Sequence, residues 1–197
     1  MINYHQKYLE TINSLNDKKR LLLHSCCAPC SSTCLERLTK YFSVDVYFYN
    51  PNITSINEYE KRLSEQVRLV DLVYKNEVNV INATYKKDEF LSAVKGLEDL
   101  PEKSSRCKNC YLLRLEKTAK YAKENGYDYF TTTLSLSPHK NSDWINEIGI
   151  ELQEKYGVKF LCADFKKEGG YLRSIELSKK YNLYRQNYCG CEFSKRL

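Results

Sequence analysis

Short apolar segments alternate with longer amphipathic segments along most of the chain. Strands joined through helical crossovers pair in parallel, with helices covering both faces of the sheet. The alternation therefore predicts an α/β fold, a three-layer sandwich around a mostly parallel five-stranded sheet, in a single domain over residues 1–197. Five apolar segments are the predicted strands: residues 20–25, 44–49, 78–83, 127–134 and 158–163.

The sequence contains no apolar run long enough to cross a bilayer. Its opening segment also lacks the apolar centre of a secretory signal. We therefore expect a cytoplasmic protein in a reducing compartment, without a membrane partner.

Basic residues are in moderate excess, with 31 Lys and Arg against 25 Asp and Glu and a net charge of +6. Basic clusters of this kind suit a phosphate-rich partner such as RNA, although solvated helix faces explain them equally well. The clusters lie at residues 18–20, 86–87, 166–167, 179–180 and 195–196.

The chain contains nine cysteines, and seven of them fall into three groups. In a reducing compartment, clustered cysteines indicate metal or redox chemistry rather than disulfides. Cys34 and Cys162, outside the groups, are predicted to be small buried core residues. The groups are Cys26, Cys27 and Cys30; Cys107 and Cys110; and Cys189 and Cys191.

The three groups are predicted to meet at one edge of the sheet. The first group directly follows the first strand, and ligands of parallel α/β sheets bind beyond the carboxyl ends of the strands. Cys107 and Cys110 begin a helix, where the helix dipole favours thiolate over thiol. In the third group, Gly190 lets the backbone approach its neighbours closely.

Seven thiolates are more than the four that a structural zinc ion or one iron–sulfur cluster needs. The surplus suggests a cluster with a second metal, or a cluster with a redox-active pair. The spacing of Cys26, Cys30 and Cys34 does not fit a radical-SAM triad, Cys-x-x-x-Cys-x-x-Cys. The cysteines do not fit a zinc ribbon either, because a zinc ribbon needs two Cys-x-x-Cys motifs close together in the sequence. They do not fit a thioredoxin-like protein, which needs only one Cys-x-x-Cys motif.

Three polar side chains lie near the predicted strand ends. His24 is interpreted as a hydrogen-bonded core histidine rather than a ligand. His139, in a polar loop, is either a surface residue or close to a pocket. Asp164 follows the fifth strand and is a candidate proton donor or substrate contact.

Six motifs occur along the chain, and together they resemble the cobalamin-independent epoxyqueuosine reductases, the QueH family. The resemblance implies an adenine-nucleotide-hydrolase-like (HUP, Rossmann-like) fold. After the first strand, however, the cysteine turn replaces the Ser-Gly-Gly-x-Asp-Ser loop of the ATP-using proteins with this fold, so we expect no ATP chemistry. The motifs are His24-Ser25-Cys26-Cys27-Ala28-Pro29 and residues 49–53, 107–115, 131–141, 164–167 and 184–191.

The resemblance also implies a 4Fe-4S cluster, an adjacent mononuclear iron and no cobalamin. Cys30 is predicted to be a further metal ligand, because relatives can carry aspartate at this position, which suits a ligand of the second iron. Which sulfur binds which metal stays open, as does whether Cys30 belongs to the cluster, to the second iron or to neither. Six cysteines match the family's positions and are the predicted cofactor ligands: Cys26, Cys27, Cys107, Cys110, Cys189 and Cys191.

The implied activity is that of an oxidoreductase, which reduces the epoxide of epoxyqueuosine at the tRNA wobble position to give queuosine. The implied partners are a tRNA whose anticodon carries epoxyqueuosine and an unidentified electron donor. Asp164 and His139 are the candidates for proton delivery or substrate contact. Two alternatives stay open: an iron–sulfur or thiol-dependent tRNA-thiolating enzyme, and a zinc-stabilised RNA-binding module.

Overall fold

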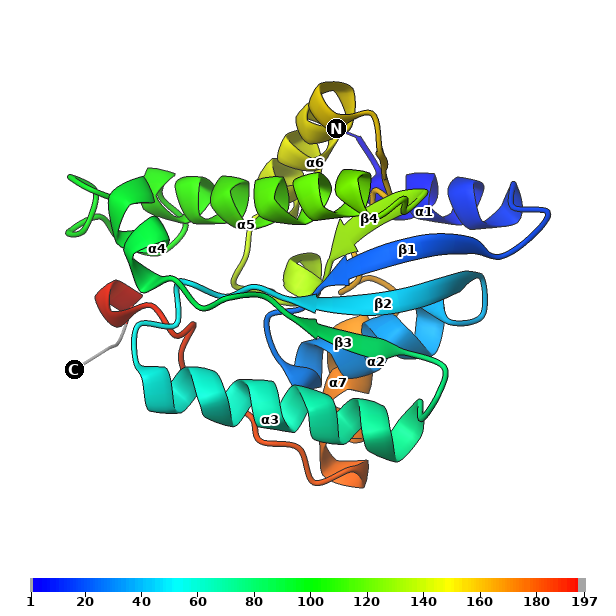
Figure 1. Ribbon diagram of the computed structural model, residues 1–197, viewed down its shortest axis with the longest axis horizontal. Coiled ribbons are helices and arrows are strands. Elements are labelled where there is room, and N and C mark those ends of the chain that lie inside the picture. Colours follow the sequence, from blue (N-terminus) through cyan, green and yellow to red (C-terminus); the bar gives the residue numbers. More distant parts are fainter. Residues whose placement is uncertain (1, 195–197) are drawn as a thin grey trace.

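The fold is built on a parallel five-stranded sheet (Figure 1). The computed structural model describes residues 2–194. The strands pair in the order β3-β2-β1-β4-β5, and every neighbouring pair is parallel, which confirms the predicted sheet. The strands are β1 (Lys19–His24), β2 (Phe42–Phe48), β3 (Asn79–Asn82), β4 (Tyr129–Thr132) and β5 (Lys159–Phe160).

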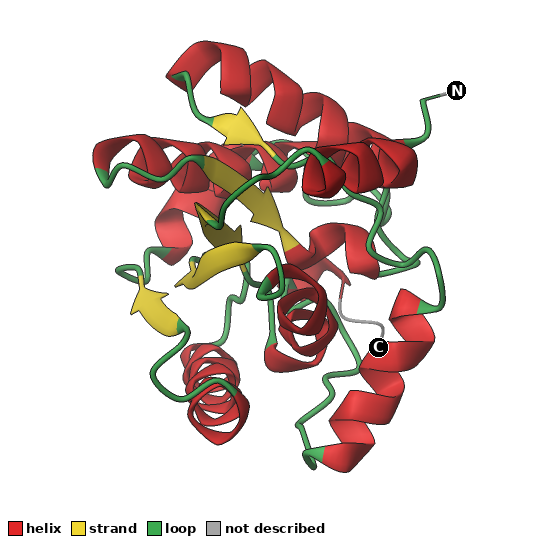
Figure 2. Ribbon diagram, turned by 90° about the vertical axis from the view of Figure 1, so that its right-hand side faces the viewer, coloured by secondary structure: helices red, strands yellow, loops and turns green. Residues whose placement is uncertain are grey.

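Helices cover both faces of the sheet, as Figures 1 and 2 show, and complete the predicted three-layer α/β sandwich. The first helix, α1 (Tyr4–Asn13), joins the core of the α2 face through Tyr8 and Ile12. One face carries α2 (Ala28–Leu38), α3 (Ile56–Val73) and α7 (Gly170–Lys180), and the other carries α4 (Lys87–Ala93), α5 (Ser105–Glu124) and α6 (Ser142–Tyr156).

The central strand, β1, is buried on both faces. Leu21 and Leu23 pack into the core on the α2 side, whereas Leu22 packs into the opposite core on the α5 side. A strand covered on both faces is apolar throughout, which explains why this segment is a continuous apolar run in the sequence. The turn that follows β1 therefore begins from a rigidly packed support.

The fourth strand is shorter than predicted. Residues 127–134 were expected to be extended, but β4 covers only Tyr129–Thr132, and Thr133–Leu136 forms the 3₁₀-helix η1. The Thr132 hydroxyl accepts a hydrogen bond from the backbone N–H of Leu134 at 3.1 Å. This local hydrogen bond takes the place of the next hydrogen bond of the sheet, so the chain leaves the sheet and enters η1.

The fifth strand is also shorter than the predicted residues 158–163, because side chains take over its backbone partners. The Thr131 hydroxyl donates to the carbonyl oxygen of Leu161 at 2.9 Å. The Asn146 side chain binds both backbone groups of Ala163, at 2.9 Å and 3.1 Å. These contacts satisfy the backbone without a further strand, and β5 ends at Phe160.

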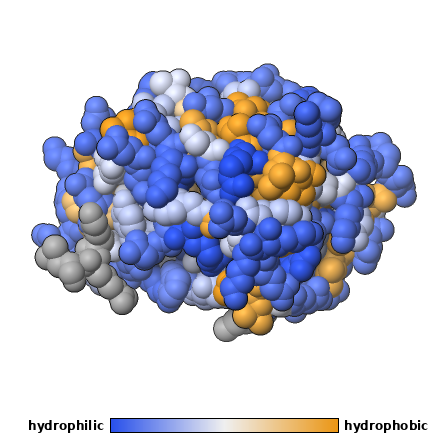
Figure 3. Space-filling model, turned by 90° about the horizontal axis from the view of Figure 1, so that it is seen from below, coloured by the Kyte–Doolittle hydropathy of each residue, from blue (hydrophilic) through white to orange (hydrophobic). Residues whose placement is uncertain are grey.

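The surface seen in Figure 3 is mainly hydrophilic, with separate hydrophobic patches. On α3, the exposed apolar side chains are Ile56, Val67 and Leu72. Separate apolar side chains of this kind are ordinary at a protein surface.

Within residues 2–194, no helix has the length and apolar character needed to span a membrane. The basic cluster at residues 195–196 lies outside the described residues. The single domain over residues 1–197 stays a prediction.

Gly149 on α6 packs against β5 with no room for a side chain. A Cβ atom at this position would lie 2.4 Å from the ring of Phe160. We expect Gly149→Ala to lower the free energy of unfolding by about 1–3 kcal/mol, the usual cost of overpacking a core. Urea denaturation measures this change.

Glu151→Ala, at an exposed position of the same helix, is the matched control. Its effect should stay within about 0.5 kcal/mol, as for most surface substitutions. Equal losses of stability in the two variants would contradict the tight contact between Gly149 and Phe160.

Candidate metal centre

All seven grouped cysteines line one cavity of about 510 Å³. The strands in Figure 1 point toward the side of the molecule where the C-terminal segment lies, and the cysteine turn directly follows the carboxyl end of β1. The predicted meeting of the three groups is therefore found in the structure. The turn contributes Cys26, Cys27 and Cys30, α5 contributes Cys107 and Cys110, and the C-terminal segment contributes Cys189 and Cys191.

The first group forms a tight turn at the start of α2. Cys27 is the N-cap residue of this helix, and Cys30 lies in its first turn. Pro29 occupies the same turn, where its missing N–H leaves no helical hydrogen bond unmade. The sulfur atoms of Cys26, Cys27 and Cys30 all lie within 4.8 Å of one another. One metal ion or cluster can therefore contact all three.

Polar side chains from three other segments hold this turn. The Asn50 amide donates to the carbonyl oxygen of Ser25 at 2.8 Å. The Ser25 hydroxyl donates to Oε1 of Gln66 on α3 at 2.7 Å. The backbone N–H of Cys26 donates to the hydroxyl of Thr133 at 3.2 Å. The position of the sulfur atoms is thus fixed by contacts with residues far away in the sequence.

The second group lies at the start of α5, as predicted, with Cys107 in the first turn and Cys110 one turn later. The expectation that this position favours the thiolate is wrong for Cys110. Burial raises the pKa of the Cys110 thiol to about 11, and the positive charge of Arg114 offsets this only in part. Desolvation therefore outweighs the helix dipole at this residue.

The third group depends on Gly190, whose φ of +103° is accessible mainly to glycine. A Cβ atom here would lie 2.8 Å from Cγ1 of Ile53. The backbone N–H of Thr54 donates to the carbonyl oxygen of Gly190 at 3.1 Å. The predicted close approach of the backbone is confirmed, and it places Cys189 and Cys191 on either side of this contact.

Arg62 on α3 holds the same C-terminal segment. Its guanidinium donates to the carbonyl oxygens of Cys189 at 3.1 Å and Tyr188 at 3.2 Å. An ion pair of 2.6 Å with Glu58 fixes the guanidinium, and only 2% of Arg62 is exposed. The pattern of α3 in the sequence does not separate Arg62 from the solvated charges around it, so sequence analysis did not identify it.

The cavity is strongly cationic. Among the described residues, its one acidic lining residue is Glu102. Within residues 2–194, neither Arg114 nor Lys140 forms an ion pair with a carboxylate; their polar partners are neutral groups and thiols. The basic lining residues are Arg62, Arg106, Arg114, His139, Lys140 and Arg185.

These cations favour ionisation of the nearby thiols. Burial opposes ionisation of Cys189, but the positive charges of Lys140 and Arg114 outweigh it and lower the pKa of this thiol. Lys140 Nζ lies 3.7 Å from the Cys189 sulfur. Hydrogen bonds from Cys27 and Cys30 lower the pKa of Cys26 well below its usual range, against the effect of burial. The pKa is raised at Cys27 and Cys30 by the neighbouring thiols, and at Cys110 and Cys191 by burial. The thiolate, which is the metal-binding form of cysteine, is therefore favoured at Cys26 and Cys189.

The residues that were predicted to belong to the core do not line the cavity. His24 is fully buried, and its Nδ1 lies 2.8 Å from the hydroxyl of Thr132. Burial, with the charge of Arg114, lowers the pKa of His24 to about 3, so the ring is neutral. Cys34 is fully buried, while Cys162 is partly buried against the core on the α5 side.

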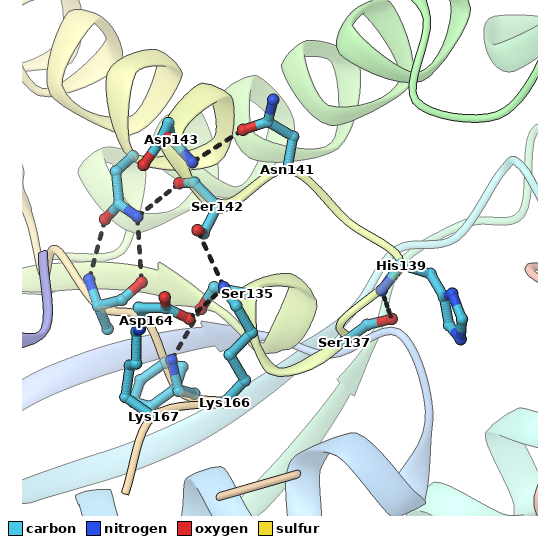
Figure 4. Close-up of polar contacts among 12 residues, drawn as sticks. Ser135, Ser137, His139, Asn141, Ser142, Asp143, Asp164, Lys166 and Lys167 are labelled. Atoms are coloured by element: carbon cyan, nitrogen blue, oxygen red, sulfur yellow. Dashed lines mark hydrogen bonds and ion pairs between the residues drawn. The ribbon is translucent and has the colours of Figure 1, made fainter. Parts of the chain in front are cut away.

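The two polar candidates lie in different places. His139 lines the cavity, and its backbone N–H donates to the Ser137 hydroxyl at 3.3 Å. Asp164 does not line the cavity; it is 7% exposed and forms a 2.6 Å ion pair with Lys166. Figure 4 shows the Asp164 carboxylate facing Lys166, separate from the loop that carries His139. The structure therefore brings His139, but not Asp164, to the cysteines.

The sequence contains a spacing signal for Arg114. It follows Cys107 and Cys110 at a spacing of three and then four residues, which places all three side chains on one face of α5. All three line the cavity. Lys140, in the loop before α6, has no comparable pattern.

The fold and the site define a class of protein: an α/β protein with a parallel five-stranded sheet and clustered cysteines in the turn after its first strand. The U34-tRNA thiolase NcsA from Methanococcus maripaludis, solved with its [4Fe-4S] cluster, has a similar structure, with a TM-score of 0.58 over 98% of this chain and 67% of that chain. At 13% identity, the likeness shows the fold alone. The sequence model of the family described as Epoxyqueuosine reductase QueH matches residues 21–197. The chain belongs to this family.

Three relatives that carry the same family description are similar over most of the chain. The protein from Staphylococcus epidermidis is 47% identical over 183 residues, which are 90% of this chain and 77% of the relative. The one from Streptococcus pyogenes serotype M1 is 44% identical over 180 residues, 90% of this chain and 71% of the relative. The one from Thermotoga maritima is 44% identical over 181 residues, 88% of this chain and 89% of the relative.

Arg62→Leu should release the C-terminal cysteines, because it removes two hydrogen bonds from a charged donor. Such bonds are each worth roughly 1.5–3 kcal/mol. In the metal-free protein, we expect iodoacetamide to alkylate Cys189 and Cys191 at least about tenfold faster. A tenfold change requires the free energy of local opening of this segment to fall by only about 1.4 kcal/mol. Peptide mass spectrometry measures both rates.

Arg68→Leu is the control on the same helix, since Arg68 binds Glu65 and the carbonyl oxygen of Asn182 instead. This variant should alkylate like the unaltered protein. Unchanged alkylation in Arg62→Leu would show that Arg62 does not hold the segment.

Proposed function

We propose that this protein is an epoxyqueuosine reductase, an oxidoreductase that acts at the wobble position of a tRNA. Two electrons and two protons enter, both C–O bonds of the epoxide break, an alkene forms and the oxygen leaves as water. One observation carries the proposal: a member of this family brings seven cysteines from three distant segments to one cavity.

The donor set fits an iron–sulfur cofactor. Arg114 and Lys140 supply positive charge that would offset the negative charge of thiolate-bound iron. When bound, the cofactor supplies single electrons and a Lewis acid for the epoxide oxygen. We propose that Cys30 is a ligand of a mononuclear iron beside a 4Fe-4S cluster, without cobalamin, and that the remaining ligands are Cys26, Cys27, Cys107, Cys110, Cys189 and Cys191.

The protein's own side chains would position the substrate and deliver protons. His139 is our candidate for proton delivery, because it is exposed and lines the cavity beside the cysteines. Asp164, predicted for the same role, is engaged by Lys166 outside the cavity lining, and we leave it out of the mechanism. Arg185 is an exposed cation of the lining that could contact a phosphate.

The proposed substrate is a tRNA whose anticodon carries epoxyqueuosine. The modified base would have to leave the anticodon stack to reach the cysteines, and the cationic lining would favour the approach of a polyanion. A separate electron donor must supply the two electrons. We place the reaction in the cytoplasm, where a reducing environment keeps the cysteines available for metal.

The alternative of a tRNA-thiolating enzyme draws on the fold that the chain shares with the U34-tRNA thiolase. That likeness does not extend to function at 13% identity, whereas the matching relatives at 44–47% identity are all described as epoxyqueuosine reductases. A zinc-stabilised RNA-binding module would also use clustered cysteines, but it would not need seven.

Protein purified without oxygen should contain iron and acid-labile sulfide. With a strong chemical reductant, it should convert epoxyqueuosine in tRNA to queuosine, as nucleoside analysis would measure. Absence of sulfide, or persistence of epoxyqueuosine, would overturn the proposal. Zinc without sulfide would instead support the RNA-binding module, and ATP-dependent sulfur incorporation would support the thiolating enzyme.

Cys110→Ala should lower the activity at least about 100-fold, more than the loss of an outer partner of a metal ligand usually costs. Cys34→Ala is the matched control, because Cys34 is buried in the core outside the cavity lining. This control should keep its iron, sulfide and activity. Equal losses in the two variants would argue against a specific role of Cys110 as a ligand.

A further inference from the structure

Arg114 is a buried cation next to the cysteines, and its side chain is only 1% exposed. It lies on α5 one turn beyond Cys110 and lines the cavity. Cysteines of all three groups line this same cavity. Arg114 is therefore placed centrally among segments that are distant in the sequence.

The other partners of Arg114 do not neutralise its charge. Nη2 donates to Oδ1 of Asn50 at 2.6 Å, and Nε lies 3.3 Å from Nε2 of His24. The His24 ring is neutral, as described above, and no carboxylate of residues 2–194 forms an ion pair with this guanidinium. Burying an unpaired charge is costly, so its counter-charge has to lie in the cavity, at the thiolates and what they bind.

Asn50 links the guanidinium to the cysteine turn. The Asn50 oxygen accepts from Arg114, while its amide donates to the carbonyl oxygen of Ser25 at 2.8 Å. His24, on the other side, is fixed by Thr132 at 2.8 Å. The guanidinium is thus held by neutral groups, which do not compensate its positive charge, in a cavity that the cysteines also line.

We propose that Arg114 is a positioning residue that raises the reduction potential of the cofactor held by the cysteines, with Asn50 and His24 keeping its charge in place. The proposal rests on the function proposed above. Each electron that enters a thiolate-bound cluster adds negative charge, and a fixed buried cation stabilises the reduced form more than the oxidised form. Arg114 thereby makes the centre easier for an electron donor to reduce.

The test is a redox titration of the anaerobically purified holoprotein, followed by electron paramagnetic resonance of the reduced cluster. In Arg114→Met, the equilibrium constant for reduction should fall at least about tenfold, a decrease of about 59 mV for one electron. Arg114→Lys, which keeps the charge, should recover most of this shift. Arg37→Met is the matched control, because Arg37 is a partly buried arginine that binds backbone carbonyl oxygens and does not line the cavity.

Asn50→Asp tests the same charge without removing the guanidinium. The new carboxylate would face Arg114 Nη2 in place of the Asn50 oxygen and would neutralise it, so the potential should fall here too. If Arg114→Met does not assemble a cluster, the reduction potential of this variant tests the role of the Arg114 charge. A potential equal to that of the unaltered protein, in whichever of the two variants holds a cluster, overturns the proposal.

Failure of the inference can be distinguished from failure of the proposed function. If the unaltered protein assembles no iron–sulfur cluster, the proposed cofactor and function fail together, and the role of Arg114 fails with them. If the cluster forms and the protein reduces epoxyqueuosine, but the reduction potential of the cluster does not change with the charge at position 114, only the role of Arg114 fails.

Discussion

The parallel pairing of β1 with β2 and β4 is the constraint on which the candidate metal centre depends. Because these strands run in the same direction, the turn after β1, the loop after β2 and η1 after β4 all leave the sheet at one edge. Asn50 and Thr133 in the last two segments bind the turn that carries Cys26. An antiparallel neighbour would deliver its loop to the opposite edge, and this support would be lost.

Charge is the second organising feature of the site. Arg114 and Lys140 lie beside the thiols without a carboxylate partner among residues 2–194, so their counter-charge has to come from the thiolates and from what these bind. A thiolate-bound metal cofactor would compensate both charges. The features that make the site costly for a metal-free protein are therefore those that suit an anionic cofactor.

The same fold serves different chemistry elsewhere, as the U34-tRNA thiolase with a TM-score of 0.58 illustrates. A fold determines where the loops lie at the edge of the sheet, but it does not determine which residues those loops contain. In this chain, the choice at the first turn is a pair of adjacent cysteines with a third at the start of α2. The C-terminal segment then reaches the same edge because α3 holds it through Arg62.

The sequence by itself determined the order of strands and helices and the three cysteine groups, because apolar periodicity and residue spacing are local patterns. It also placed His24 in the core correctly. Only the tertiary structure decided that Asp164 turns to Lys166 and that Cys110 is too buried for the helix dipole to ionise it. Likewise, Arg62 becomes a site residue through a partner 127 positions away, Cys189. Ionisation and positioning depend on burial and on contacts between distant segments, and no local pattern in the sequence records either.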